Sequence, residues 1–507
     1  MFAKRYRPDE LIEIIAAQSY SPEIVAYVKK VEHQPTLAHY LKSKPKLGVT
    51  GTIAKDYVEA TTPNAVPYIS TKQVKGLHAY IEDAKYISKE ADIEWKKCRV
   101  DDGDIVINKS GDVGAAAVLC CAPYKYANSV SDIISIKLSE TAPIDRDFLV
   151  VYLNSPFGQK QLQRLSGGAI FSHVSLHAIP HINVYTADVL AQKYIGDKVR
   201  QAERLRAWAA SAQEETVREM PAYKPMISHY AESSYRVSPD ILLSARLDSS
   251  FFHPDHRALD SKMKESGCQY FGKMAFAVKP GWNKKSSDSF LYYEIGGLNV
   301  SNGTIVPVET LTSEAPSRAT TAVKHGDVLV STVRPNRKNV GFVIEDEQDI
   351  PMVATSGFSV IRFESLVDAA FYHAWLRTDD ATSQLMRWNS GSAYPAIDED
   401  VPLQIFVPEF DASLRERLGQ TLLDTHFALL HSAKLTNAAK LLVGDLIEGQ
   451  ITEAQLIAAE QALQVGNDTL DRKILSRLKT DGIDGDGAAL FSDLDELYRL
   501  LALAEVE

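Results

Sequence analysis

The chain has 507 residues, of which 45% are hydrophobic and 24% are charged. A single hydrophobic core rarely grows beyond about 250 to 300 residues, so this length predicts two or three domains. The composition excludes a disordered or fibrous protein, and no apolar run reaches the roughly 18 residues that a transmembrane helix requires. The N-terminal residues also lack the apolar stretch of a secretion signal, so we expect a cytoplasmic protein with no membrane partner.

The net charge of −11 is concentrated at the C-terminal end of the chain. From Glu448 onward there are 13 acidic and 5 basic residues, a balance of −8, which leaves −3 for the first 447 residues. A nearly neutral body still allows local clusters of Lys and Arg to contact phosphate groups. The acidic end is typical of a segment that faces a protein partner.

Short strands and then a long helix are predicted in the first part of the chain. The segments "AVPYISTKQV", "GDIVINKS" and "DIISIKL" are short β-rich runs bounded by Gly, Pro or Asn, which is typical of strands. A helix from Phe148 leads into the small-residue turn "SGGAIFSHVS". From Asp188 to Met220 apolar residues recur every three, four or seven positions, which predicts one long helix that Pro221 ends.

The second part of the chain repeats the first part. The segment "DDGDIVINKSGDVGAAAVL" corresponds to "VKHGDVLVSTVRPNRKNVGFVI", in which Gly326 lies 223 positions after Gly103 (326 minus 103). Repetition at a fixed spacing indicates a duplicated fold. The same spacing relates Leu153 to Leu376, Gly168 to Gly391, and the residues that start the two long helices, Asp188 to Asp411.

We therefore predict an α+β fold in which two β-rich units are joined by two long helices. Because each long helix carries only a narrow apolar stripe, the two are expected to pack against each other as an antiparallel pair. The predicted order is a first unit at 1–187, a helix at 188–220, a connector at 221–247, a second unit at 248–410, a helix at 411–449 and an acidic helical tail at 450–507.

Motifs for catalysis and for metal binding are absent from the sequence. There is no phosphate-binding loop, dinucleotide fingerprint, zinc-protease motif or nucleophile elbow, and no Asn/Asp-Pro-Pro-aromatic run to hold an extruded base. The four cysteines form no C-x-x-C pair, and "DGIDGDG" lacks the ligand spacing of a calcium loop. We expect no catalytic residue and no metal site in this chain.

Basic and amide side chains gather instead in the loops of the second unit, notably "VRPNRKNVG" and "AVKPGWNKKSS". Arg and Asn have paired donors and acceptors that match guanine and adenine edges, whereas Lys and Ser suit phosphate oxygens. A solvated basic loop is the alternative interpretation. The DNA-binding candidates here are Lys279, Trp282, Asn283, Lys284, Lys285, Arg334, Asn336, Arg337, Lys338 and Tyr394.

The corresponding loops of the first unit carry a weaker form of the same pattern, and a purely structural role fits them equally well. The candidates are Lys72, Gln73, Lys75, Lys109, Arg164, Ser172 and His173.

Two copies of this unit, with "GD(I/V)(V/L)(I/V)" strands, the turn "SGGAIFSHVSLHAIP" and a long helix after each copy, resemble the specificity subunit of Type I restriction-modification enzymes. The phrases "SARLDSSFFHP" and "LLVGDLIEGQIT" are similar to that family too, and the resemblance extends to about Ile451. It implies two target-recognition domains, each of which reads one half of a split double-stranded DNA site, and two conserved helices that set the gap. The resemblance also implies that two methyltransferase subunits, which would bind S-adenosylmethionine, assemble on the specificity subunit. A motor-nuclease subunit binds to this complex when the DNA is cleaved. No cofactor is expected in this chain.

The acidic stretch from about Gln455 and the weakly basic body depart from the family pattern. These departures leave room for the specificity chain of a Type IIB-like enzyme, or for a non-catalytic DNA-binding scaffold of another defence complex. A self-contained modification enzyme and a scaffold that binds only proteins are further alternatives. The first of these would need a cofactor pocket, and the basic "RPNRK" turn disfavours the second.

Overall fold

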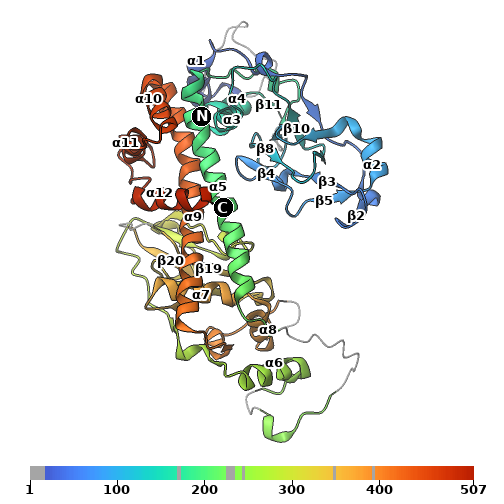
Figure 1. Cartoon of the computed structure of the whole chain (residues 1–507), viewed down its shortest axis with the longest axis vertical. Helices are drawn as coiled ribbons and strands as arrows, with labels where there is room; N and C mark the ends of the chain where they lie inside the picture. Colours follow the sequence, from blue (N-terminus) through green and yellow to red (C-terminus); the bar gives the residue numbers. More distant parts are fainter. Residues whose placement is uncertain are drawn as a thin grey trace. The chain divides into compact units, whose positions relative to one another are not determined.

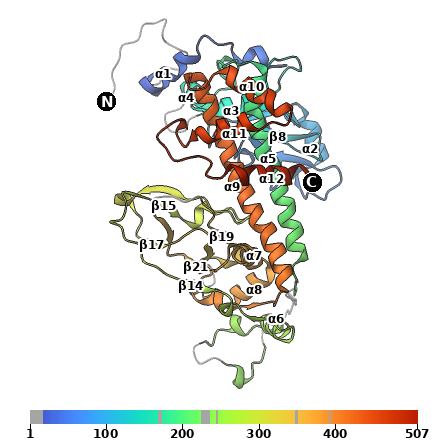
Figure 2. The same ribbon diagram turned by 60° about the vertical axis from the view of Figure 1, so that its left-hand side comes forward.

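The computed structural model describes residues 17–167, 173–223, 235–242, 246–345, 350–390 and 394–506. The chain divides into two compact units (Figures 1 and 2). Unit 1 comprises Met1–Glu203 and Ala433–Glu496, and unit 2 comprises Arg204–Ser432 and Leu497–Glu507. The long helices α5 (Val189–Glu219) and α9 (Ala412–Glu448) therefore each begin in one unit and end in the other.

Two five-stranded sheets form the β-rich part of unit 1. The first has the order β1 (Lys46–Leu47), β10 (Ile133–Ile136), β7 (Ile105–Asn108), β8 (Ala116–Cys120) and β4 (His78–Tyr80). The second has the order β2 (Tyr57–Val58), β5 (Lys85–Ile87), β3 (Val66–Ile69), β9 (Tyr126–Ser129) and β6 (Arg99–Asp101). The strands are short and mostly buried, as the apolar runs in the sequence predict.

Four short helices of unit 1 each have a polar residue as N-cap. They are α1 (Pro22–Val31), α2 (Lys89–Glu94), α3 (Arg146–Asn154) and α4 (Pro156–Arg164). Ser21, Ser88, Asp145 and Ser155 each accept a hydrogen bond from the backbone N–H three residues further on, which satisfies a donor that the helix itself leaves free.

Unit 2 contains two four-stranded sheets. The first has the order β14 (Phe276–Val278), β21 (Phe358–Arg362), β18 (Val328–Ser331) and β19 (Val340–Phe342), and the second β16 (Val308–Leu311), β15 (Ser289–Tyr293), β20 (Met352–Thr355) and β17 (Ala319–Ala322). The helices α6 (Pro254–Glu265), α7 (Leu366–Leu376) and α8 (Asp379–Arg387) belong to this unit. Its largest core cluster includes Phe371 and Trp375 of α7, both fully buried.

The two units repeat one topology. The order β10-β7-β8 in unit 1 corresponds to β21-β18-β19 in unit 2, all antiparallel. In the other sheet, β3 runs parallel to β9 as β15 runs parallel to β20. Gly103 and Gly326, which precede β7 and β18, have φ angles of +83° and +86°, a left-handed conformation that favours glycine. The predicted duplication and α+β class are therefore confirmed.

The long helices were predicted correctly as well. Within unit 2, Arg417 near the start of α9 forms an ion pair of 2.6 Å with Glu219 at the end of α5, so the two helices run antiparallel there. Figures 1 and 2 both show α5 and α9 side by side. Within the described residues, no helix combines the length and the apolar character that crossing a membrane demands.

The acidic C-terminal segment packs on the body of the chain. It forms α10 (Glu453–Gln464), α11 (Thr469–Arg477), the hairpin of β23 (Leu478–Lys479) and β24 (Gly482–Ile483), and α12 (Leu494–Val506). In unit 1, the Nζ atom of Lys193 lies 2.6 Å from Glu460, and the buried Nζ of Lys198 lies 2.7 Å from Asp471. Acidic residues of the segment thus form ion pairs within the chain, and binding of a protein partner by this segment stays a prediction.

Candidate nucleic-acid interface

The loops that follow β7 and β18 occupy the same place in the two copies. In unit 1 the backbone N–H of Val174 donates to the carbonyl oxygen of Lys109 at 3.2 Å. In unit 2 the backbone N–H of Ile397 donates to the carbonyl oxygen of Thr332 at 2.9 Å. Donors and acceptors are each separated by the same 223 positions (397 minus 174, 332 minus 109). Loop 109–115 and loop 332–339 are therefore the two copies of one anchored loop, and both carry predicted DNA-binding residues.

Loop 332–339 presents the densest group of candidates. The backbone N–H of Arg334 donates to the carbonyl oxygen of Pro395 at 2.7 Å, and its guanidinium carbon lies 4.9 Å from the ring centre of Tyr394. The Tyr394 side chain is 69% exposed, and Arg334 beside it is half-buried. Asn336 and Arg337 on the following turn, η13 (Pro335–Arg337), are exposed as well. The structure thus places Tyr394 beside the three loop candidates, and the contact of all four with DNA stays a prediction.

Lys338 closes the same loop. Its Nζ atom lies 2.7 Å from Asp379, at the start of α8. Lys279 pairs at 2.7 Å with Glu399, which lies five residues after Tyr394 in the sequence. Both lysines carry an acidic partner in the free chain, so a phosphate would have to compete with that partner.

The other candidates of unit 2 belong to the turn before β15, where local contacts occupy several of them. The indole of Trp282 packs on Phe290 with ring centres 4.3 Å apart, and Lys284 lies over the indole at 5.7 Å. The Asn283 side chain accepts from the backbone N–H of Lys285 at 3.0 Å, an Asx turn. Lys284 and Lys285 remain exposed to solvent.

In unit 1 the candidates lie in separate places. Lys109 is half-buried, and His173 on β12 (His173–Val174) is exposed beside it. Lys72 and Lys75 are exposed after β3 in the other sheet, but the Gln73 amide accepts from the Ser70 backbone N–H in a capping box. Ser172 lies outside the described residues.

Arg164 has a structural counterpart in unit 2. Its guanidinium faces the ring of Tyr20 at 6.0 Å, and Arg387, 223 positions later (387 minus 164), faces the ring of Phe251 at 4.3 Å. Arg387 also forms an ion pair with Asp260. A pair of arginines against aromatic rings at equivalent places indicates a packing role, although a DNA contact of Arg164 stays a prediction.

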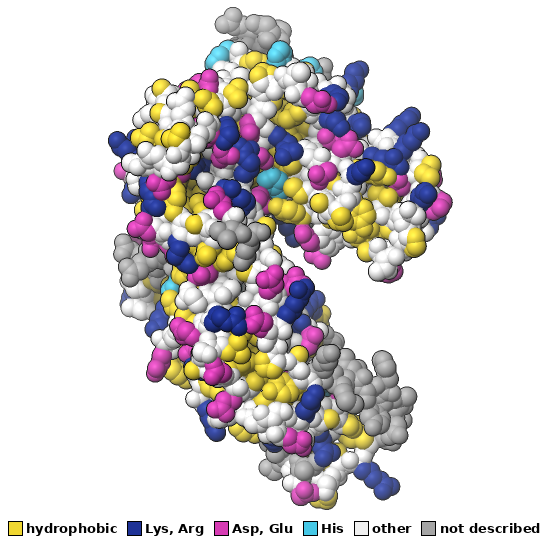
Figure 3. Space-filling view, viewed as in Figure 1, with side chains coloured by type: hydrophobic (Ala, Val, Ile, Leu, Met, Phe, Trp, Pro, Cys, Tyr) yellow, Lys and Arg dark blue, Asp and Glu magenta, His cyan; other side chains and the backbone are white. Residues whose placement is uncertain are grey.

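Exposed lysines around α2 were missed in the sequence. Lys85, Lys89, Lys96 and Lys97 are all exposed, and basic side chains stand over the α2 part of unit 1 in Figure 3, with acidic ones between them. The signal was the Lys-rich sequence "YISKEADIEWKKCRV". Charges of both signs are typical of an ordinary solvated surface, so this region is a weaker candidate than loop 332–339.

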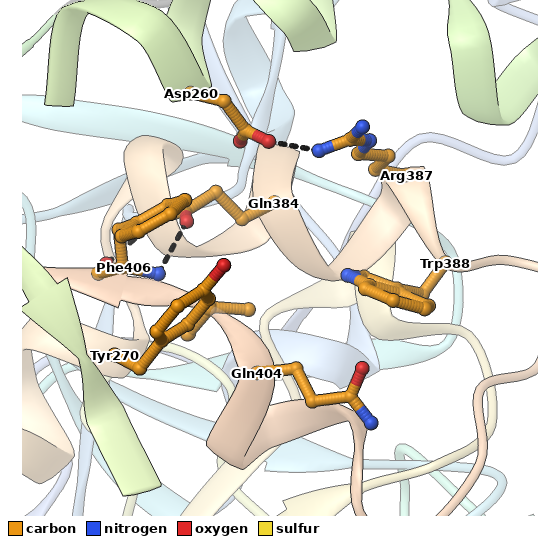
Figure 4. A pocket seen from close by; sticks show the side chains of 8 residues that line it. Asp260, Tyr270, Gln384, Arg387, Trp388, Gln404 and Phe406 are labelled. Carbon is orange, nitrogen blue, oxygen red and sulfur yellow. Dashed lines mark hydrogen bonds and ion pairs between the residues drawn. The ribbon is translucent and has the colours of Figure 1, made fainter. Parts of the chain in front are cut away.

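The pocket in Figure 4 belongs to unit 2. It is lined by Asp260, Tyr270, Gln384, Arg387, Trp388, Gln404, Ile405 and Phe406. Three of its polar side chains form bonds within the pocket: Asp260 pairs with Arg387, and Gln384 bonds the backbone of Phe406. Over the parts of the chain that the structure describes, no cluster of three His, Cys, Asp or Glu side chains could hold a metal ion.

Comparison with solved structures finds similar chains. The chain is similar to the S subunits of Type I restriction-modification systems. The HsdS subunit from Thermoanaerobacter tengcongensis is 21% identical over 42% of this chain, with a TM-score of 0.26, and the match spans 48%, about half, of that subunit. The S subunit from M. genitalium is 12% identical over 83% of this chain and 96% of its own, with a TM-score of 0.38.

A third similar structure was described for complex assembly and conformational transition of the type I R-M system. It is 13% identical over 86% of this chain and 96% of its own, with a TM-score of 0.24. No protein-family model and no curated protein matches the sequence.

Proposed function

We propose that the chain is the DNA sequence-specificity subunit of a restriction-modification complex. Each unit contacts one half of a split DNA site, and the chain positions methyltransferase subunits on that site without catalysing a reaction itself. The observation that supports this proposal is one fold present twice, with the same anchored loop in each copy and different side chains on the two loops.

A duplicated fold with unequal loops suits a bipartite and asymmetric site. Loop 332–339 offers Arg334 and Arg337, and Arg makes the most common bidentate contact with guanine. Loop 109–115 offers Lys109 but no arginine, and lysine is suited to phosphate oxygens. Two copies of one scaffold that differ in this way would select different base pairs in their two half-sites.

The charge of the chain supports a role within a larger complex. Neutralisation of phosphates by basic side chains supplies most of the non-specific affinity of proteins for DNA. The net charge here is −11, and the best-placed lysines, Lys279 and Lys338, already have acidic partners. We infer that partner subunits contribute much of the basic surface that holds the duplex.

Those partners would be two methyltransferase subunits that bind S-adenosylmethionine, with a motor-nuclease subunit where the complex also cleaves DNA. The specificity chain of a Type IIB-like enzyme is the second candidate, since the packed acidic segment after α9 departs from the Type I pattern. In both candidates this chain recognises the split DNA site. They differ in whether a motor-nuclease subunit is needed for cleavage.

Sequencing of methylated DNA from cells with and without this chain tests the proposal. We expect one methylated motif, with two specified halves around an unspecified gap, to disappear when the chain is removed. In vitro, the chain alone and the methyltransferase alone should each fail to methylate that motif, whereas the mixture should methylate it. An unchanged set of methylated motifs in cells, or methyl transfer by the isolated chain, would contradict the proposal.

A further inference from the structure

Two basic residues of loop 332–339 have a backbone conformation that their side chains disfavour. Among the described residues, five residues other than glycine have a positive φ angle: Asn64, Asp83, Arg334, Lys338 and Asp484. Asn and Asp adopt this left-handed conformation comparatively easily, because their short polar side chains can bond the local backbone. Arg334 and Lys338, with φ angles of +52° and +55°, lack a short polar side chain of this kind.

The other copy of the loop makes the same turn with glycine. In loop 109–115 the left-handed residues are Gly111 and Gly114, with φ angles of +76° and +87°. Gly111 corresponds to Arg334 at the 223-residue spacing (334 minus 111), and Gly114 corresponds to Lys338 after one additional residue. Glycine is the default residue at such positions because it has no Cβ atom to clash. Unit 2 thus carries two strained basic residues where unit 1 has none.

The side-chain contacts of Arg334 and Lys338 do not account for this difference. Arg334 is half-buried and lies over the ring of Tyr394, which is 69% exposed, and Lys338, 39% exposed, pairs with Asp379, whose side chain is 79% exposed. Cation–π contacts and ion pairs at such exposed positions stabilise a fold only weakly. Backbone strain that the fold itself does not need is characteristic of residues that act on a ligand.

We propose that Arg334 and Lys338 determine the specificity and strength of DNA binding by unit 2. Arg334 reads a guanine: its backbone N–H bonds the carbonyl oxygen of Pro395 and its guanidinium lies over the Tyr394 ring, so both ends of the residue have a partner before DNA arrives. Its planar fork suits a bidentate contact with a base. Lys338, at the other end of the same turn, exchanges Asp379 for a phosphate. The inference rests on the proposed function, since it assigns the reading of one half-site to these side chains.

The test replaces each residue with the glycine that unit 1 uses. Arg334→Gly, Lys338→Gly and Arg334→Lys are compared with the unaltered chain in complex with its methyltransferase. Asp83→Gly is the matched control, because Asp83 is an exposed left-handed residue with a φ angle of +60° outside the candidate site. The measurements are the thermal midpoint of the chain and binding to a library of randomised duplexes at two salt concentrations.

Both glycine variants should keep or raise the thermal midpoint, because glycine relieves the strain. Arg334→Gly should lose the preference for one base pair of one half-site, with about 5- to 150-fold weaker binding to the preferred sequence. Arg334→Lys should lose that preference too, since lysine lacks the bidentate fork. Lys338→Gly should weaken all sequences alike and reduce the salt slope by about one. Asp83→Gly should leave DNA binding unchanged.

Two outcomes separate this inference from the function on which it rests. If the unaltered complex selects a split sequence and both Arg334 variants retain every base preference, Arg334 is not the reading residue and the inference fails while the function stands. If glycine variants lower the thermal midpoint and leave binding intact, these residues are structural. If the unaltered complex selects no sequence, the proposed function itself fails.

Discussion

Gln161 and Gln384 perform the same structural task in the two copies of the fold. The Gln161 amide accepts a hydrogen bond from the backbone N–H of Asn183 at 2.8 Å and donates to its carbonyl oxygen at 2.9 Å. Gln384 binds the backbone of Phe406 in the same two ways, at 2.6 and 3.0 Å (Figure 4). Both glutamines are buried, so the duplication extends to the polar interior of the units.

Loss of either glutamine should destabilise its own unit. Gln384→Ala removes the side-chain partner of both the N–H and the carbonyl of Phe406, whereas Gln161→Ala removes that of the Asn183 N–H and leaves the Asn183 carbonyl its bond from the Tyr152 hydroxyl. A buried polar group that loses its partner costs about 1 to 3 kcal/mol. The unfolding of each unit can be followed by hydrogen exchange of its strands. Gln404→Ala is the control, because that amide bonds Asp400 at an exposed position, and it should change stability by less than about 0.5 kcal/mol. Equal effects of all three variants would contradict the assigned role.

The ion pair between Lys198 and Asp471 should hold the C-terminal segment on α5. Both side chains are buried, and the hydroxyl of Tyr194 also donates to Asp471 at 2.6 Å. Lys198→Met alone leaves a buried carboxylate without its cation and should cost about 3 to 5 kcal/mol, whereas Lys198→Met with Asp471→Leu should recover much of that loss. Proteolysis of the segment 450–496 measures its release. A double variant no more stable than the single one would show that the two residues act separately.

His78 makes unit 1 sensitive to high pH. Burial opposes its charge, but hydrogen bonds to Asp147 and Glu203 outweigh burial and raise the pKa of His78 to about 9. Because the folded pKa exceeds the ordinary value near 6.5, the stabilisation is complete below about pH 6.5 and is lost as the pH rises toward 9. Unit 1 should therefore unfold more easily at pH 9 than at pH 6.5, and His78→Gln should remove this pH dependence. A dependence that persists in His78→Gln would assign it to another group.

His426 gives unit 2 the opposite pH dependence. It is buried with its Nε2 atom 3.2 Å from Nδ1 of His373, and burial together with the Arg377 charge lowers the pKa of His426 to about 3. The folded unit keeps this imidazole neutral, so its stability is full above about pH 6.5 and falls as the pH decreases and the unfolded chain takes up the proton. Melting curves between pH 7 and 4 should show this loss, and His426→Gln should reduce it. No change in that slope would contradict the assignment.

The sequence predicts the duplication because turn residues and apolar strands recur at a fixed spacing. Gly103 and Gly326 could be aligned by their identity alone, and both have the left-handed conformation that explains the identity. Gln73 is predicted from the sequence only as a DNA-binding candidate, although "STKQ" has the Ser-x-x-Gln pattern of the capping box that the structure shows. A residue with a local structural role of this kind is a weaker candidate for DNA contact.

Contacts between distant residues explain what the sequence could not predict. Lys198 and Asp471 are 273 residues apart, and Lys279 and Glu399 are 120 apart. No periodic pattern connects such pairs, because their proximity follows from how helices and sheets pack. The strain at Arg334 could not be predicted either, since a turn with Pro335 and Asn336 is compatible with several backbone conformations.

Exchange of the anchored loop tests whether it reads DNA independently of its unit. Residues 332–339 would replace 109–115 in unit 1, where the anchoring bonds come from the backbone and do not depend on the side chains. We expect a folded chain that is destabilised by about 1 to 3 kcal/mol per strained residue, because Arg and Lys replace Gly111 and Gly114. The half-site of unit 1 should gain the base preference that loop 332–339 gives to unit 2, while the gap and the other half-site stay unchanged. The control is the same exchange with glycine in place of the transplanted arginine, which should fold more stably and gain no preference. Identical binding by both exchanged chains would show that base reading depends on surfaces outside this loop.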